Sequence, residues 1–217
     1  MKTIPKMVSG LIWPVLVGLM LFLPAWTLDY WQAWVVLLLV FVVFTWIPGI
    51  YLMRKNPAAL QRRMRAGPAA ETRTVQKVVS AVRHLSLAAT FVVSALDHRF
   101  GWSPVPTAIC LVGDVLIAVG LGVTMLVVIQ NSYAAATVRI EAGQKLVSTG
   151  LYGLVRHPMY TGAVIMTVGI PLALGSYWGL VFVVPGVLAL ALRIRDEEKL
   201  LMEELDGYRE YVQNVHY

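Results

Sequence analysis

Long apolar runs dominate this chain and restrict what it can fold into. Four of them are close to the roughly 20 residues that an α-helix needs to cross a bilayer, and a polar stretch divides a fifth. Hydrophobic residues make up 58% of the chain, whereas soluble domains contain about 45–50%. We expect helices at 8–26, 31–53, 79–96 and 104–130 and a hairpin within 161–192. The sequence therefore predicts an all-α integral membrane protein with five to six transmembrane helices.

The end of the chain predicts a hairpin followed by a surface helix. The segment 175–179 combines glycine, serine and two aromatic residues, which is typical of a turn at a membrane interface. Its two arms are short, so we expect a compact hairpin. From Arg193 onward, apolar residues recur at steps of three and four, namely Leu201, Leu205, Tyr208, Val212 and Val215. This stripe predicts a cytoplasmic amphipathic helix that lies on the membrane or folds back over nearby polar segments.

The basic residues predict the orientation of the chain. If the N-terminus is cytoplasmic, six crossings place every Lys and Arg except Arg99 on the cytoplasmic side, where membrane proteins concentrate them. Both termini and the polar segments near residues 150 and 195 are then cytoplasmic. The basic segment 54–83 is expected to meet anionic lipid. The net charge of +6 is explained by this multi-pass topology, so nucleic-acid binding is not expected.

The remaining features of the sequence are its division into two regions and a few isolated reactive or polar residues. We expect N-terminal transmembrane helices over 1–130 and a ligand-binding region over 131–217. The single cysteine, Cys110, excludes disulfides and multi-cysteine metal sites. Asp114 lies inside an apolar run, where an acid either marks function or pairs with another helix. His84 and His98 stand alone near helix ends and are interpreted as structural.

Two polar clusters flank the hairpin and carry the chemistry. The first lies in 150–162 and contains two tyrosines, an arginine and a histidine, and the second lies in 193–198. A hairpin that crosses the membrane and returns places both clusters at one surface. Glu197 could accept a hydrogen bond from a ligand ammonium or hydroxyl group, and Arg193 could hold an anion. These two residues are four apart and share a helix face, so a simple ion pair is the structural alternative.

These motifs resemble the C-terminal half of the isoprenylcysteine carboxyl methyltransferase family, and the membrane phospholipid methyltransferases share the Arg-His-Pro and Glu-Glu elements. The resemblance covers roughly 137–212. It rests on three motifs in order and spacing: Gly150-x-Tyr152-x-x-Val155-Arg156-His157-Pro158-x-Tyr160-x-Gly162, Arg193-x-x-x-Glu197-Glu198-x-x-Leu201 and Gly207-Tyr208-x-x-Tyr211.

The resemblance implies S-adenosylmethionine as the methyl donor, bound between the two clusters at the cytoplasmic face. It implies these cofactor contacts: Gln144, Lys145, Leu146, Val147, Tyr152, His157, Pro158, Met159, Tyr160 and Glu197. It also implies that Arg193 contacts the substrate. No metal site is expected, because His157, Glu197 and Glu198 lack the spacing of a metal-binding motif.

The methyl acceptor is left open at this stage. A carboxylate, as in an isoprenylcysteine, needs no base, and Arg193 would orient it. A phospholipid amine must lose a proton, and His157 or Glu198 would then be the base. In both cases the substrate is amphiphilic or lipid-like, and no obligate protein partner is inferred. An NADPH-dependent membrane reductase of the sterol type and a non-enzymatic transporter or scaffold are the alternative functions.

Overall fold

The computed structural model describes residues 4–57, 60–61, 73–131, 133 and 144–216, and within them the side chains of 4–11 and 42–45 are not described. This part of the chain is helical and contains no strand. Its elements are α1 (Ile4–Ala25), α2 (Trp31–Leu38), a π-helical stretch (Leu39–Trp46), α3 (Ile47–Lys55), α5 (Thr74–Phe100), α6 (Thr107–Gln130), a 3₁₀ turn (Gly150–Gly153), α7 (Pro158–Ala173), α8 (Gly179–Glu204) and α9 (Tyr208–Asn214).

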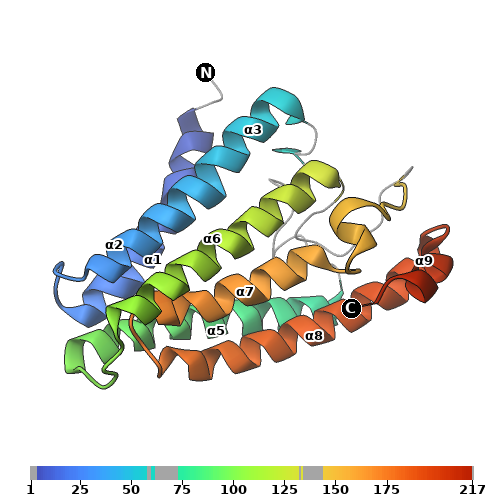
Figure 1. The fold of residues 1–217 in the computed structure, drawn as a ribbon. Coiled ribbons are helices and arrows are strands. Elements are labelled where there is room, and N and C mark those ends of the chain that lie inside the picture. Colours follow the sequence, from blue (N-terminus) through green and yellow to red (C-terminus); the bar gives the residue numbers. More distant parts are fainter. Residues whose placement is uncertain (1–3, 58–59, 62–72, 132, 134–143, 217) are drawn as a thin grey trace.

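The helices run side by side as a bundle. Figure 1 shows the short connections 26–30, 101–106 and 174–178 gathered at one end of the bundle. The 3₁₀ turn, the start of α7, the end of α8 and α9 lie at the other end. The two polar clusters recognised in the sequence therefore meet at one end of the molecule.

The outer surface of the bundle is suited to lipid. Helices α5 and α6 are each long and apolar enough to cross a membrane, and shorter apolar helical stretches occupy 12–25, 31–41 and Pro158–Ala173. Large side chains such as Leu85, Val115 and Leu188 are exposed on the faces that no other helix covers. The predicted all-α membrane class is confirmed, while the number of crossings stays a prediction.

Two helix boundaries in this bundle differ from the prediction. Helix α5 runs from Thr74 to Phe100 instead of 79–96, because Gly101 ends it in the left-handed conformation (φ 65°). Asp97 is therefore inside the helix and only 1% exposed. Its carboxylate accepts hydrogen bonds from the backbone N–H and hydroxyl of Ser103, at 2.7 and 2.6 Å, and from the Ser176 hydroxyl at 2.5 Å. This cluster ties two of the short connections together.

The predicted helix from Arg193 to the C-terminus was wrong. Arg193 lies within α8, whose 26 residues form one long arm of the hairpin. The chain then breaks at 205–207, where Gly207 has a φ of 78°, and α9 is a separate helix of seven residues. The apolar stripe from Leu201 to Val215 is thus divided between two helices. The spacing of its apolar residues could not reveal this, because it does not report the left-handed residue that separates the helices.

The isolated polar residues have local partners. His98 stacks on Tyr30 with ring centroids 3.8 Å apart, and the His84 ring nitrogen Nδ1 lies 2.6 Å from the carbonyl of Ser80. These contacts fit the structural interpretation of both histidines. Asp114 is half-buried, and its Oδ1 has no hydrogen-bond partner within the described ranges. Thirteen of the 30 residues of the basic segment 54–83, namely 58–59 and 62–72, lie outside the described residues.

Four glycines set the close approach of α6 and α7. A Cβ atom at Gly113 would lie 2.2 Å from the backbone nitrogen of Ala173, and one at Gly120 would lie 2.5 Å from the carbonyl oxygen of Gly162. The contact is reciprocal, because Cβ atoms at Gly162 and Gly169 would each lie 2.8 Å from a glycine carbonyl of α6. Small residues allow membrane helices to pack backbone against backbone in this way. This packing fixes the start of α7, and with it the first polar cluster.

We expect Gly113→Ala to destabilise the bundle by about 1–3 kcal/mol, the usual cost of overpacking a well-packed contact. The neighbouring atoms are backbone and cannot rotate away. Gly122→Ala is the matched control on the same helix, because nothing lies within 4 Å of a Cβ atom there. Alanine favours a helix over glycine, so this control should be neutral or stabilising. Thermal unfolding of both variants in detergent, followed by circular dichroism, tests the pair, and equal midpoints would contradict the packing.

Candidate functional site

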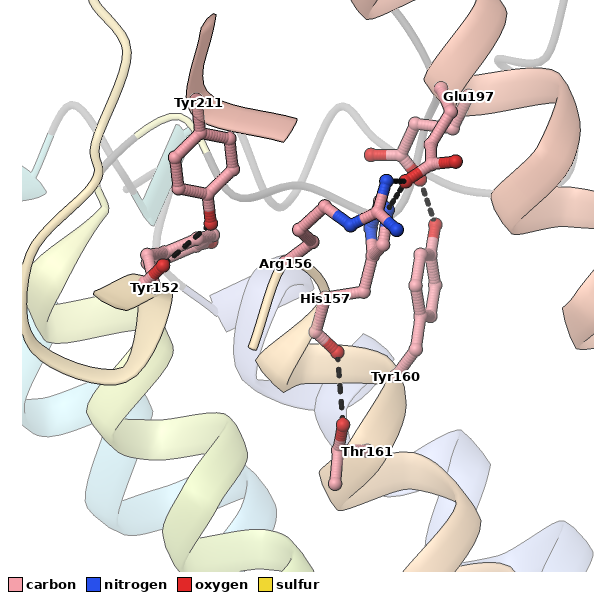
Figure 2. Close-up of polar contacts among 8 residues, drawn as sticks. Tyr152, Arg156, His157, Tyr160, Thr161, Glu197 and Tyr211 are labelled. Atoms are coloured by element: carbon pink, nitrogen blue, oxygen red, sulfur yellow. Dashed lines mark hydrogen bonds and ion pairs between the residues drawn. The ribbon is translucent and has the colours of Figure 1, made fainter. Parts of the chain in front are cut away.

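The candidate site is built where the loop before α7 meets the end of α8. Pro158 is the first residue of α7, a position where its missing N–H is no loss. It starts the helix directly after His157, so Arg156 and His157 lie on the loop and Tyr160 lies in the first turn. Figure 2 shows that Arg156, His157 and Tyr160 all point toward the end of α8, where Tyr160 contacts Glu197 and the other two contact Glu198.

Glu198 joins both residues of the loop to α8. Its Oε1 accepts a hydrogen bond from Arg156 Nη1 at 2.8 Å and lies 3.2 Å from His157 Nε2. The three side chains are almost buried, with 8–9% of each exposed. A buried ion pair with good geometry and a third polar partner is costly to break. Glu198 therefore holds the Arg-His-Pro loop against the helix.

Tyr160 bridges the two charged residues of α8 that face it. Its hydroxyl donates to Glu197 Oε2 at 2.5 Å and accepts from Arg193 Nε at 3.0 Å. Arg193 is buried, with 3% exposure, whereas Glu197 is half-buried. The predicted shared face of Arg193 and Glu197 is confirmed, but a tyrosine from α7 stands between them. Such an arrangement orients both charged groups toward one small volume.

The C-terminal segment folds back onto the same loop. Tyr211 in α9 donates a hydrogen bond to the carbonyl oxygen of Tyr152 at 2.6 Å, as Figure 2 shows, and the Arg156 N–H donates to the carbonyl oxygen of His216 at 3.3 Å. The Tyr152 hydroxyl accepts from Asn131 Nδ2 at 3.1 Å. Of the two positions predicted for the tail, the structure adopts the one over the polar clusters.

Burial reinforces the neutral state of the Tyr152 phenol. Removal of its phenol from water raises the pKa of Tyr152 to about 12, although the hydrogen bond from Asn131 opposes this and Glu197 adds to it. The tyrosine is therefore neutral at physiological pH. It can donate a hydrogen bond to a ligand but cannot serve as a base.

Comparison with known families identifies this part of the chain. Residues 108–209 match the model of the phospholipid methyltransferase family. This segment resembles that family, and we call it the methyltransferase domain. It begins in α6, includes both polar clusters and ends in α9. Neither the curated proteins nor the solved structures contain a significant match.

One side chain of the site comes from outside the methyltransferase domain and was missed in the sequence. Gln76 in α5 is completely buried, with 0% exposure. Its amide oxygen accepts from Arg193 Nη1 at 2.8 Å, and its amide nitrogen donates to Asp196 Oδ2 at 2.5 Å. Arg73 pairs with the other oxygen of Asp196 at 2.9 Å. A signal in the sequence was that Gln76 and Ser80 are polar residues four apart, so they share one face of a helix.

The structure brings together some of the predicted site residues but gives others packing roles. His157, Tyr160, Arg193 and Glu197 converge, with Tyr152 on the adjacent turn. Pro158 is buried, and Met159 packs against Leu52 and Val128.

The predicted contacts before the first cluster lie in a segment of the methyltransferase domain that is neither helix nor strand. Gln144, Leu146 and Val147 are half-buried, and Lys145 is exposed. Leu146 reaches α9, with its Cδ2 3.6 Å from where a Cβ of Gly207 would be. Residues 137–143, where the family resemblance begins, lie outside the described residues. A cofactor role for 144–147 stays a prediction.

Proposed function

We propose that this chain is an integral membrane methyltransferase that uses S-adenosylmethionine to methylate a lipid-like acceptor. The methyltransferase domain supports the reaction class. The main structural support for a ligand site is the arrangement of Arg193, Tyr160 and Glu197, which joins α7 and α8 through hydrogen bonds of 3.0 and 2.5 Å. All three residues belong to the motifs that carry the family resemblance in the sequence.

The residues present suit this cofactor. S-adenosylmethionine carries an ammonium group, ribose hydroxyls and a sulfonium centre, all of which favour a nearby carboxylate. Glu197 Oε2 is occupied by Tyr160, but Oε1 has no partner in the part of the chain that the structure describes. A half-buried carboxylate oxygen of this kind can accept a charge-assisted hydrogen bond from the ammonium or a hydroxyl.

The cofactor supplies an electrophilic methyl group, and the protein must position the acceptor and manage its proton. We propose the amine of a phospholipid headgroup as the principal acceptor. When bound, the cofactor would supply its methyl group to the amine nitrogen, and the electron pair of the broken carbon–sulfur bond would stay on its sulfur. The amine proton passes to His157. Positioning and exclusion of water provide most of the acceleration.

The contact with Glu198 suits His157 to act as this base. The His157 Nε2 atom lies 3.2 Å from Glu198 Oε1, and this contact holds the imidazole in a fixed orientation in the site. Arg193 would hold the phosphate of the headgroup. A carboxylate acceptor, as in an isoprenylcysteine, is the second candidate, because the same buried Arg193 would orient it without any base.

The topology of the bundle supports a cytoplasmic site. The end of α3, which carries Arg54 and Lys55, lies toward the same end of the bundle as the start of α5 and both polar clusters (Figure 1). Basic residues favour the cytoplasmic side. We propose that both termini share this side, where a soluble nucleotide-derived cofactor is available.

Calorimetric binding to the purified full-length chain tests this function. We expect saturable binding of S-adenosylmethionine and S-adenosylhomocysteine and no binding of NADPH. Glu197→Gln should weaken binding by about 10- to 100-fold, since hydrogen bonds to charged groups contribute about 1.5–3 kcal/mol. Glu203→Gln, at an exposed position on α8, is the control and should bind as the wild type does.

The acceptor is tested by methyl transfer to lipid vesicles. Label should pass from the cofactor to phosphatidylethanolamine, and transfer to an isoprenylcysteine alone would select the carboxylate. Binding of NADPH instead of the methyl donor would indicate a reductase. If the folded protein binds none of these ligands, a transporter or scaffold would be the remaining interpretation.

A further inference from the structure

Tyr208 presents a buried hydroxyl group that has no hydrogen-bond partner among the described residues. It is the first residue of α9, directly after Gly207, and only 3% of it is exposed. Buried polar side-chain atoms are almost always hydrogen-bonded, and leaving one unpaired is costly. An orphan hydroxyl beside a binding site therefore indicates a ligand that provides the missing partner.

Tyr208 differs in this respect from Tyr211, which is its neighbour. The two rings lie 5.6 Å apart, and both side chains are buried. Tyr211 has a clear structural role, because its hydroxyl donates to the carbonyl oxygen of Tyr152 at 2.6 Å and so attaches α9 to the 3₁₀ turn. The ring of Tyr208 contributes apolar packing, but its oxygen contributes nothing to this attachment.

The surroundings of the Tyr208 hydroxyl are the charged groups of the site. Burial raises the pKa of Tyr208, the carboxylates of Glu198 and Glu197 raise it further, and Arg156 lowers it. The hydroxyl therefore keeps its proton and is available as a donor. It lies within electrostatic reach of the residues that form the proposed cofactor site, yet it bonds to none of them.

We propose that the Tyr208 hydroxyl contacts the bound cofactor and donates a hydrogen bond to one of its acceptor atoms. This inference rests on the proposed function. It assigns α9 a direct part in binding: Tyr211 holds the helix in place, and Tyr208 provides the contact. The C-terminal segment already lies against the loop of the first cluster, through the contacts of Tyr211 with Tyr152 and of Arg156 with His216.

The test compares Tyr208→Phe with Tyr211→Phe in the full-length protein, using S-adenosylhomocysteine as the probe. Removal of the Tyr208 oxygen should leave the unfolding midpoint of the ligand-free protein unchanged or raise it, because an unpaired polar atom is removed. The same change should weaken binding about tenfold, through loss of one hydrogen bond to the ligand. Tyr211→Phe should instead lower the midpoint of the ligand-free protein.

The outcomes separate this inference from the proposed function. If the wild type binds the probe and Tyr208→Phe binds it equally well, the contact does not exist. If Tyr208→Phe destabilises the ligand-free protein as much as Tyr211→Phe does, the hydroxyl has a partner within the protein or a bound water, and the inference is overturned. Failure of the wild type itself to bind would refute the proposed function, and with it this contact.

Discussion

Replacing Glu198 with alanine should destabilise the protein by about 3–5 kcal/mol, the usual cost of breaking a buried ion pair from one side. Glu198 is 6% exposed and contacts Arg156 Nη1 at 2.8 Å and His157 Nε2 at 3.2 Å. The change leaves a buried guanidinium without its closest counter-charge. It also releases the Arg-His-Pro loop from α8. We therefore expect a large fall in the unfolding midpoint and loss of cofactor binding.

Two further variants make this result specific to Glu198. Glu198→Gln keeps the size of the side chain and one acceptor oxygen but removes the charge, so its midpoint should lie between those of the wild type and Glu198→Ala. Glu203→Ala changes an exposed acid on the same helix, and such surface changes usually stay within about 0.5 kcal/mol. Thermal unfolding in detergent measures all three. Equal midpoints for Glu198→Ala and Glu203→Ala would show that the buried pair does not stabilise the fold.

Replacing Gln76 with methionine should reduce methyl transfer by about 10- to 100-fold while cofactor binding changes little. Methionine has a similar size but can neither accept from Arg193, at 2.8 Å, nor donate to Asp196, at 2.5 Å. Hydrogen bonds to charged groups contribute about 1.5–3 kcal/mol each, and 1.36 kcal/mol in the barrier corresponds to a tenfold change in rate. Since Arg193 is proposed to hold the acceptor, the loss should be in kcat and in the KM for the lipid.

A second variant at position 76 tests the effect of charge on the contacts with Arg193 and Asp196. Gln76→Glu keeps an acceptor for Arg193 but places a carboxylate against Asp196, so we expect it to restore part of the lipid KM at a cost in stability. Ser80→Ala changes another buried polar residue of α5, one turn further along, and serves as the control. If Ser80→Ala lowers the rate as much as Gln76→Met does, Gln76 acts only through helix packing. Methyl transfer and cofactor affinity, measured separately, distinguish the two.

Gln76 also defines how much of the chain the site requires. It belongs to α5, whereas the methyltransferase domain covers 108–209. Together with Arg73, which pairs with Asp196 at 2.9 Å, it makes the N-terminal half part of the site and not only a membrane anchor. The predicted division of the chain at residue 130 thus cuts across a set of contacts, although it stays a prediction for domain organisation.

The apolar runs by themselves determined the helical membrane class. A bilayer leaves the backbone no partners except its own, so long apolar segments must become helices. The same local information placed the two polar clusters at one end, because a hairpin that crosses and returns brings its flanks together. The types of residue in those clusters, and their order, indicated the reaction class, and residues 108–209 match a methyltransferase family.

The tertiary structure decided which partner each of these residues has. Tyr160 stands between Arg193 and Glu197, Glu198 holds the loop, and Gln76 reaches Arg193 across 117 positions of sequence. Each contact depends on the rotation and register of one helix against another. Those are set by close packing, as at Gly113 and Gly120, where the helices meet backbone to backbone. A pattern of polarity specifies which face is buried but not which atom it meets, so Gln76 and Tyr208 gain their significance only once α5 and α9 have packed against α8 and the loop.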